Sequence, residues 1–197
     1  MKFRYLAVAF VLLCTLSGAY AQGALYVNPT VVRASSSTAD QSIFAFLGQG
    51  KTSEMLYGVT FGGYYDLPLQ GHQETSGFEI GIDVRDSVLH GNNALLSSFL
   101  VGPRIAYAVS PRLHPYIEPV VGLGTTRAPN TAIKVNKVQF GGFAGVDFNL
   151  NRRISFRAAE VGYGSLKATS GETVGGTESI PAVSLLTIST GFTFRLP

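Results

Sequence analysis

Residues 138–166 read VQFGGFAGVDFNLNRRISFRAAEVGYGSL and decide the fold. Apolar side chains share one parity in the first half of this stretch: Val138, Phe140, Ala144, Val146, Phe148 and Leu150. The other parity holds glycine, amide and carboxylate residues: Gln139, Gly141, Gly145, Asp147 and Asn149. A period of two predicts a β-strand. Residues 149–153 predict a tight polar turn, and the alternation resumes at Ile154, so the stretch is a predicted hairpin with two unlike faces.

Such unlike faces are unusual in a soluble hairpin, but they are normal where lipid covers one face and a narrow lumen lies behind the other. The alternation recurs in residues 25–34, 55–65, 78–84, 98–107, 115–125 and 183–196. With the two strands of the hairpin, these segments make eight. We therefore predict an all-β fold, an eight-stranded antiparallel up-and-down transmembrane β-barrel.

The first 21 residues have the pattern of a secretory signal peptide. Lys2 and Arg4 precede an apolar segment over residues 5–16, and the small-residue triplet Ala19-Tyr20-Ala21 follows. The predicted domains are a signal peptide at 1–21 and a barrel at 22–197. Charged residues make up 14% of the chain, against about 25% in soluble domains. These features predict the outer membrane of a Gram-negative-type bacterium.

Eight is an even number, so both ends of the barrel domain are expected on the periplasmic side. The two long polar connections, residues 35–53 and 165–181, are then extracellular loops. Residues 90–93 are predicted as a further loop, which contains His90. The lysines of the barrel domain are all expected in loops: Lys51, Lys134, Lys137 and Lys167.

One irregularity is predicted in the strand that follows the hairpin turn. Arg157 and Glu160 are three residues apart, so a regular strand would place them on opposite faces. A β-bulge near Ala158 or Ala159 would bring both to the polar face.

The strand pattern, the signal peptide and the ending STGFTFRL together resemble the outer membrane protein A type of eight-stranded barrel, also called OmpA-like or opacity-type barrels. The segments PRLHPYIEPVVGLG and NRRISFRAAEVGYG are similar to the fifth and seventh strand segments of that family. The resemblance implies that the barrel assembly machinery recognises a C-terminal signal formed by Ser189, Gly191, Phe194 and Leu196. Pro197 departs from the family, which normally ends on an aromatic residue.

Two groups of residues are predicted to serve the barrel itself. Nine ionisable side chains have the polar parity and are expected to pair across the lumen: Glu79, Asp83, Arg85, Arg104, Glu118, Asp147, Arg157, Glu160 and Arg195. An interior of eight strands is just wide enough for side chains to fill, which favours structural ion pairs over a selective pore. Five aromatic residues of apolar parity are expected to form a girdle at the periplasmic end: Tyr65, Tyr107, Phe148, Phe156 and Phe194.

Three alternatives stay open at this stage. A soluble, lipocalin-like barrel would show the same alternation with its faces inverted. A narrow porin-like channel would use the charged lumen for transport. An outer-leaflet lipid-modifying enzyme would need a nucleophile and an oriented base, for which the sequence offers His90 with Ser87, Ser97 or Ser98 and Asp86.

We expect a monomer that is not an enzyme and has no cofactor, no metal site and no nucleic-acid partner. Its partners would be outer-membrane lipid, the assembly machinery, and an extracellular ligand held by loops 35–53 and 165–181, since exposed loops on a rigid scaffold commonly carry recognition. The predicted role is structural or adhesin-like.

Overall fold

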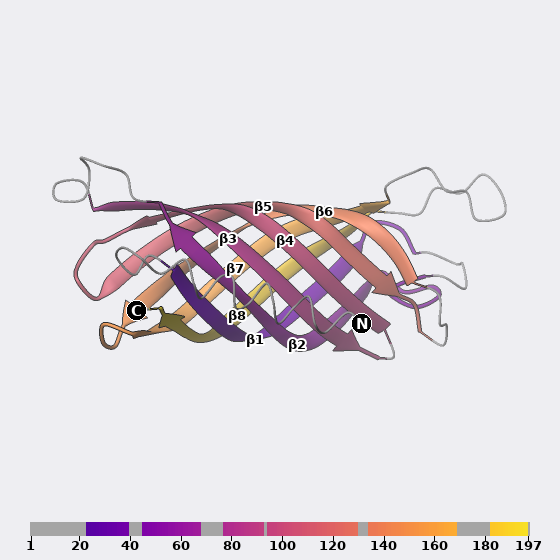
Figure 1. The fold of residues 1–197 in the computed structure, drawn as a ribbon. Helices are drawn as coiled ribbons and strands as arrows, with labels where there is room; N and C mark the ends of the chain where they lie inside the picture. Colours follow the sequence, from indigo (N-terminus) through magenta and orange to yellow (C-terminus); the bar gives the residue numbers. More distant parts are fainter. Residues whose placement is uncertain are drawn as a thin grey trace, which may run out of the picture.

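The computed structural model describes residues 23–39, 45–67, 77–92, 94–129, 134–168 and 182–196. They form eight strands: β1 (Gly23–Ser36), β2 (Ser53–Asp66), β3 (Phe78–Gly91), β4 (Ala94–Tyr107), β5 (Leu113–Arg127), β6 (Lys134–Asn149), β7 (Ile154–Ala168) and β8 (Val183–Arg195). Every strand pairs antiparallel with its neighbour along the chain, and β8 pairs with β1, which closes the barrel (Figure 1). The predicted eight-stranded up-and-down architecture is confirmed. The predicted signal peptide lies outside the described residues.

None of the described segments forms a helix with the length and hydropathy needed to cross a membrane.

The strands are strongly staggered. Starting at Val183 on β8, the registered partners pass through β7, β6, β5, β4, β3, β2 and β1, and return to β8 at Thr193, ten residues further along. Closing a sheet with such a stagger tilts the strands against the barrel axis, and Figure 1 shows them crossing diagonally. Residues at one level of the barrel therefore come from very different positions within their strands.

The predicted bulge in β7 is confirmed. The pairing of β7 with β8 shifts between Arg157 and Glu160, and the pairing with β6 shifts between Val146 and Asp147. The extra residue restores the phase, because Arg157 and Glu160 are both buried inside the barrel. An ion pair of 3.2 Å joins Arg157 Nη1 to Glu160 Oε2.

The two ends of the barrel differ. We call the end at which β1 begins and β8 ends the terminal end; it carries the turns 108–112 and 150–153. The opposite end, which carries the connections 37–52 and 169–182, is the loop end. The connection between β3 and β4 is also at the loop end and is only the pair 92–93, because both strands run further than the sequence pattern indicates.

Several sequence-based boundaries are corrected by these longer strands. His90 belongs to β3 rather than to a loop. Ser35 and Ser53 pair with each other, and the strand β7 continues past Ser165, so both long loops are shorter than predicted. Three lysines expected in loops lie in strands: Lys134 and Lys137 in β6, and Lys167 in β7. Lys137 is buried inside the barrel.

The loop-end half of the interior contains an apolar cluster that was not predicted from the sequence, beside the buried polar side chains of Lys137, Gln139 and Thr126. Two residues of the β1–β2 connection, Phe46 and Leu47, fold back into the barrel mouth and are buried there. They join inward-facing strand residues in one cluster, which we call the apolar layer: Val32, Ala34, Phe46, Leu47, Leu56, Leu89, Ala94, Leu96, Leu166, Val183 and Leu185.

The other half of the interior is polar and contains aromatic rings, three of which face a glycine on a neighbouring strand. Registered pairs join Tyr26 to Gly62 on β2, Tyr116 to Gly145 on β6, and Phe143 to Gly162 on β7. A Cβ at each of these glycines would collide with the ring opposite it. The missing side chains therefore make room for large rings inside a narrow barrel.

This packing predicts a sharp difference between two nearby glycines of β6. A Cβ at position 145 would lie 2.6 Å from Tyr116 Cζ, whereas a Cβ at 142 would lie 3.6 Å from its nearest neighbour, the Glu118 carbonyl oxygen. Gly145→Ala should lower the free energy of unfolding by about 1–3 kcal/mol through overpacking. The matched Gly142→Ala should be neutral or slightly stabilising. Urea unfolding in detergent micelles measures both, and equal effects would contradict the proposed role of Gly145.

Candidate functional site

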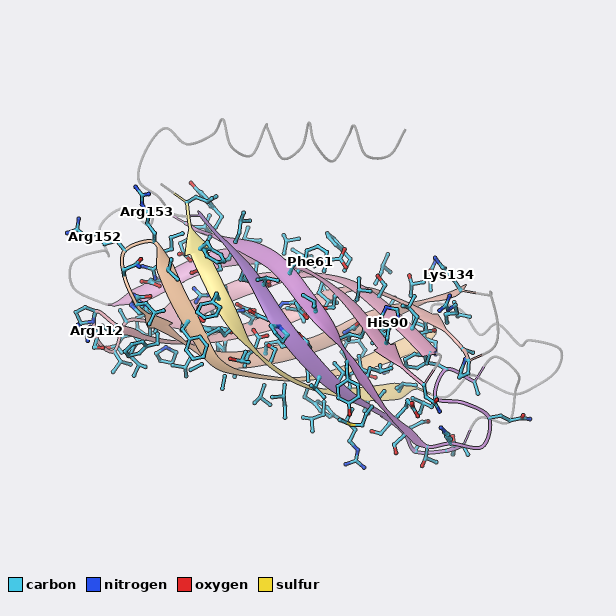
Figure 2. The ribbon with its side chains drawn as sticks, turned by 90° about the horizontal axis from the view of Figure 1, so that it is seen from below. Phe61, His90, Arg112, Lys134, Arg152 and Arg153 are labelled. Atoms are coloured by element: carbon cyan, nitrogen blue, oxygen red, sulfur yellow. The ribbon has the colours of Figure 1, made fainter. Side chains whose placement is uncertain are left out.

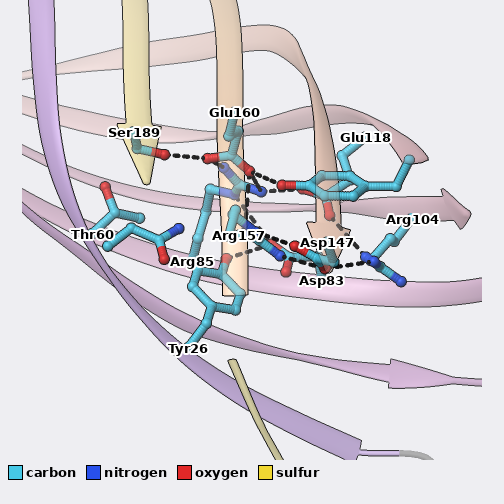
Figure 3. Close-up of polar contacts among 12 residues, drawn as sticks. Tyr26, Thr60, Asp83, Arg85, Arg104, Glu118, Asp147, Arg157, Glu160 and Ser189 are labelled. Carbon is cyan, nitrogen blue, oxygen red and sulfur yellow. Dashed lines mark hydrogen bonds and ion pairs between the residues drawn. The ribbon is translucent and has the colours of Figure 1, made fainter. Parts of the chain in front are cut away.

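A group of charged side chains lies in the polar half of the interior (Figure 3). Arg85, on β3, is at its centre. Its guanidinium group pairs with Asp83 at 3.1 Å and with Glu160 of β7 at 3.2 Å, and it also pairs with Glu118 of β5. The contact with Glu160 is bidentate, since a second nitrogen donates to the other carboxylate oxygen at 3.3 Å. Arg85 thus links opposite sides of the barrel.

Two further arginines complete the group. Arg157 Nε donates to Asp147 Oδ1 at 2.9 Å, and Arg157 Nη1 donates to Glu160. Arg104 Nη2 donates to Asp147 Oδ2 at 3.0 Å, and its Nε lies 3.3 Å from Glu118 Oε1.

These contacts form a closed circuit of alternating charge, which we call the ion-pair ring. Its order is Arg85, Glu160, Arg157, Asp147, Arg104, Glu118 and back to Arg85. The six side chains come from five strands and are at most 2% exposed. Every carboxylate of the ring contacts two guanidinium groups, which is the geometry that offsets the cost of removing charges from water.

Aromatic rings and hydroxyl groups surround the ion-pair ring. Tyr26 donates to Asp83 at 3.0 Å, and Tyr116 and Ser189 donate to Glu160 at 2.7 and 2.9 Å. The Arg157 guanidinium lies 4.5 Å from the Tyr26 ring centre and 4.7 Å from that of Tyr116.

The other two guanidinium groups also stack on aromatic rings. Arg104 lies 4.1 Å from the ring centre of Tyr64, and Arg85 lies 3.9 Å from that of Phe143. Guanidinium groups stack well on aromatic faces because they are planar and weakly hydrated.

The structure places the nine predicted lumen residues in three settings. Seven lie together in and beside the ring: Asp83, Arg85, Arg104, Glu118, Asp147, Arg157 and Glu160. Glu79 is nearer the terminal end, where its carboxylate lies 3.3 Å from His114 Nδ1. Arg195 donates to the side-chain oxygen of Asn149 at 3.1 Å. Asp66, which is not among the nine predicted residues, lies 3.8 Å from Arg104.

The interior aromatics were also missed as site residues, although the sequence carried a signal for them. Tyr64 and Tyr116 share the parity of the charged residues, and so does Phe143. An aromatic residue on the glycine-rich parity is the pattern that would have identified them.

The residues of the predicted C-terminal signal have different environments. Ser189 is buried against Glu160, and Gly191 sits where a Cβ would collide with the Val27 carbonyl oxygen and the Asn28 side chain. Phe194 and Leu196 are exposed on the outside of the barrel.

The five predicted girdle residues lie near the terminal end, and four of them are exposed on the outer surface: Tyr65, Tyr107, Phe148 and Phe194. Phe156 is partly exposed, and its ring lies 5.4 Å from that of Phe192. Tyr107 similarly packs on Phe78, with ring centres 4.9 Å apart.

The residues considered for catalysis do not come together. Ser87 and Ser98 are buried inside the barrel, whereas His90 has the outward parity of β3. Asp86 and Ser97 also have the outward parity, but Ser97 is registered with Val88 and Asp86 with Phe99. Within the described part of the chain, no hydrogen bond joins His90 to a serine or an aspartate.

Comparison with solved structures defines the class of fold. The sequence matches no protein-family model and no curated protein. Neisserial surface protein A is 12% identical, with a TM-score of 0.62 over 91% of this chain and 100% of that chain. The fold is that of the small eight-stranded outer-membrane barrels.

Two further structures were found at lower similarity. Ail, the attachment invasion locus protein of Yersinia pestis, is 10% identical, with a TM-score of 0.47 over 89% of this chain and 99% of that chain. The N-terminal β-barrel domain of Pseudomonas aeruginosa OprF is 14% identical, with a TM-score of 0.38 over 89% of this chain and 100% of that chain.

The ion-pair ring predicts a large effect for Arg157→Leu. The substitution leaves Asp147 and Glu160 buried with fewer partners, and breaking one side of a buried pair costs about 3–5 kcal/mol. Arg33→Leu, on the outward face of β1, is the matched control and should change stability little. Urea unfolding in micelles compares the two variants. Equal stability of Arg157→Leu and wild type would show that the ring contributes nothing.

Proposed function

We propose that this chain is a small integral outer-membrane protein whose interior is sealed. Its surface loops act in recognition or adhesion. The observation that carries the proposal is the filling of the interior by two successive layers. The ion-pair ring crosses the polar half, and the apolar layer packs inside the loop-end half. Neither layer resembles the water-filled lumen of a large porin.

The outer surface supports a membrane location. Large apolar side chains cover it, and Phe61, Phe99 and Tyr163 are 49%, 53% and 66% exposed. A soluble, lipocalin-like barrel would place such residues inside and charged residues outside, which is the reverse of what these strands do. The outward aromatics near the terminal end fit an interfacial girdle.

The orientation follows from the ends. Short turns at the periplasmic side and longer loops outside are typical of these barrels. The two longest connections, 37–52 and 169–182, are at the loop end, so we place the terminal end in the periplasm, although it carries the connection 67–77 beside its two short turns. The barrel assembly machinery would read the C-terminal signal from that side.

The β1–β2 connection fits a rigid surface feature. Phe46 and Leu47 anchor it in the barrel mouth, while residues 49–52 are exposed beyond them. Gly48 and Gly50 have φ values of 92° and 74°, which favour glycine and shape the exposed turn. Lys51 pairs with Glu54 at 3.3 Å. A binding partner would therefore meet a surface held in place by the apolar layer.

The competing functions rest on weaker observations. An enzyme would need a nucleophile beside a base, and the candidate serines and His90 are apart. A narrow channel would need a continuous water-filled path, and large buried side chains of the ion-pair ring and the apolar layer occupy the interior. Ail, whose name refers to attachment and invasion, and Neisserial surface protein A, named for the cell surface, are compatible in kind with a surface role.

Electrical recording tests the sealed interior. The purified protein, refolded and inserted in planar bilayers, should produce no stepwise current, and Arg157→Leu should remain equally silent because the apolar layer is untouched. Protection of the strands from added protease shows that the protein has inserted. Reproducible single-channel steps from inserted wild-type protein would favour the narrow channel and overturn the proposal.

A further inference from the structure

Three exposed arginines gather on two turns of the terminal end. Arg112 ends the turn 108–112, and Arg152 and Arg153 end the turn 150–153. Figure 2 shows all three at one end of the barrel, with Lys134 and His90 toward the other end. These three side chains belong neither to the ion-pair ring nor to the surface loops.

The two turns are held in fixed conformations. In the first, the Ser110 hydroxyl accepts from the backbone nitrogens of Arg112 and Leu113 at 3.3 and 3.1 Å. In the second, Asn151 Oδ1 accepts from the backbone nitrogens of Arg153 and Ile154 at 2.8 Å each. Side chains of this type stabilise turns by satisfying their free backbone donors.

Asn149 ties the two turns to each other. Its backbone nitrogen donates to the Arg112 carbonyl at 2.8 Å, and its side-chain nitrogen donates to the Pro111 carbonyl at 3.0 Å. A further bond runs from the Arg195 nitrogen to the Arg153 carbonyl at 2.8 Å. The arginines therefore project from a single braced platform, so little backbone entropy would be lost when they bind a ligand.

Within the described residues, no side chain neutralises the positive charge of this platform. The acidic residues described at this end, Asp66 and Glu79, pair with Arg104 and His114 at the mouth of the lumen. Across the described residues, no carboxylate lies within ion-pair distance of Arg112, Arg152 or Arg153. Three guanidinium forks are thus available to an external anion.

Apolar side chains stand beside the arginines on the same turns. Val109 and Leu150 are 57% and 55% exposed, and Leu113 is also exposed. A soluble anion would gain nothing from contact with these apolar side chains. Apolar residues interleaved with arginines suit the membrane interface. There the apolar groups reach the acyl region and the guanidinium groups bind phosphates.

We propose that Arg112, Arg152 and Arg153 form a binding platform for the phosphate headgroups of anionic phospholipids in the inner leaflet of the outer membrane. The placement in the inner leaflet rests on the orientation given under the proposed function. The platform fixes the depth of the terminal end in the bilayer and selects anionic lipids around it. The Asn149 side chain positions the two turns and does not itself contact the lipid.

Lipid selectivity of the full-length protein tests the platform. The protein is reconstituted in phosphatidylcholine vesicles that contain spin-labelled phosphatidylglycerol or spin-labelled phosphatidylcholine, and the motionally restricted fraction of each label is measured. Wild type should hold phosphatidylglycerol severalfold better than phosphatidylcholine. The triple variant Arg112→Gln/Arg152→Gln/Arg153→Gln should lose most of that preference, because glutamine keeps polarity but has no charge.

The loop end offers a matched control. Arg127→Gln/Lys134→Gln/Lys167→Gln removes the same charge from exposed or partly exposed positions at the other end and should retain the preference. Equal losses in both triple variants, or no loss in the first, would overturn the proposal. Addition of millimolar inorganic phosphate should leave the preference unchanged; abolition by phosphate would mean that the site takes a free anion.

Trypsin treatment of intact cells tests the orientation separately. Cleavage after Lys51, with the bonds after Arg112, Arg152 and Arg153 spared, is the expected result. Cleavage at the three arginines from outside would place the platform in the outer leaflet and overturn the orientation, whatever the vesicle experiment shows. A correct orientation with no lipid preference would overturn the platform alone.

Discussion

The ion-pair ring is the interaction on which this barrel depends. Eight strands enclose an interior just wide enough for side chains to fill, so a charge that points inward must be neutralised by another side chain. Arg85, Arg104 and Arg157 meet this condition because each contacts at least two carboxylates. The ring joins strands that are far apart in the sheet, so it also constrains the barrel cross-section.

Other local features of the chain make the ring possible. The bulge in β7 turns both Arg157 and Glu160 inward, where a regular strand would send one of them to the outside. Gly62, Gly145 and Gly162 create space for the aromatic rings that stack on the guanidinium groups. The stagger of ten residues brings the charged residues of the ring and these aromatic residues to a common level of the barrel. They reach this level from different parts of their strands.

The sequence predicted which face of the sheet each residue of the ring occupies, but not how far along the barrel axis it lies. Alternation shows which face a residue occupies, so the strands, the bulge and the inward carboxylates and arginines followed from the parity of residues such as Asp83 and Arg157. Alternation carries no information on depth. Arg195 and Glu79 share the parity of the ring but lie nearer the terminal end, where Asn149 and His114 are their neighbours.

The apolar layer was missed for a related reason. Leu56, Leu96 and Leu166 are apolar residues on the polar parity at the loop ends of their strands. Such a break in the alternation indicates the end of a strand, although here the strand continues with an apolar inner face. The same error shortened β3 and placed His90 in a loop. The packing of Phe46 and Leu47 into the mouth depends on contacts between distant segments, which periodicity cannot show.

A double-mutant cycle on Arg85 and Glu160 tests the central claim most directly, because this bidentate pair joins β3 to β7 across the interior. Arg85→Met, Glu160→Met and the double variant are unfolded in urea under identical micellar conditions. The account predicts that the double variant is more stable than the sum of the single losses implies, with a coupling energy of about 2–3 kcal/mol. Losses that add to within about 0.5 kcal/mol would show that the two charges do not support each other, and would contradict the account.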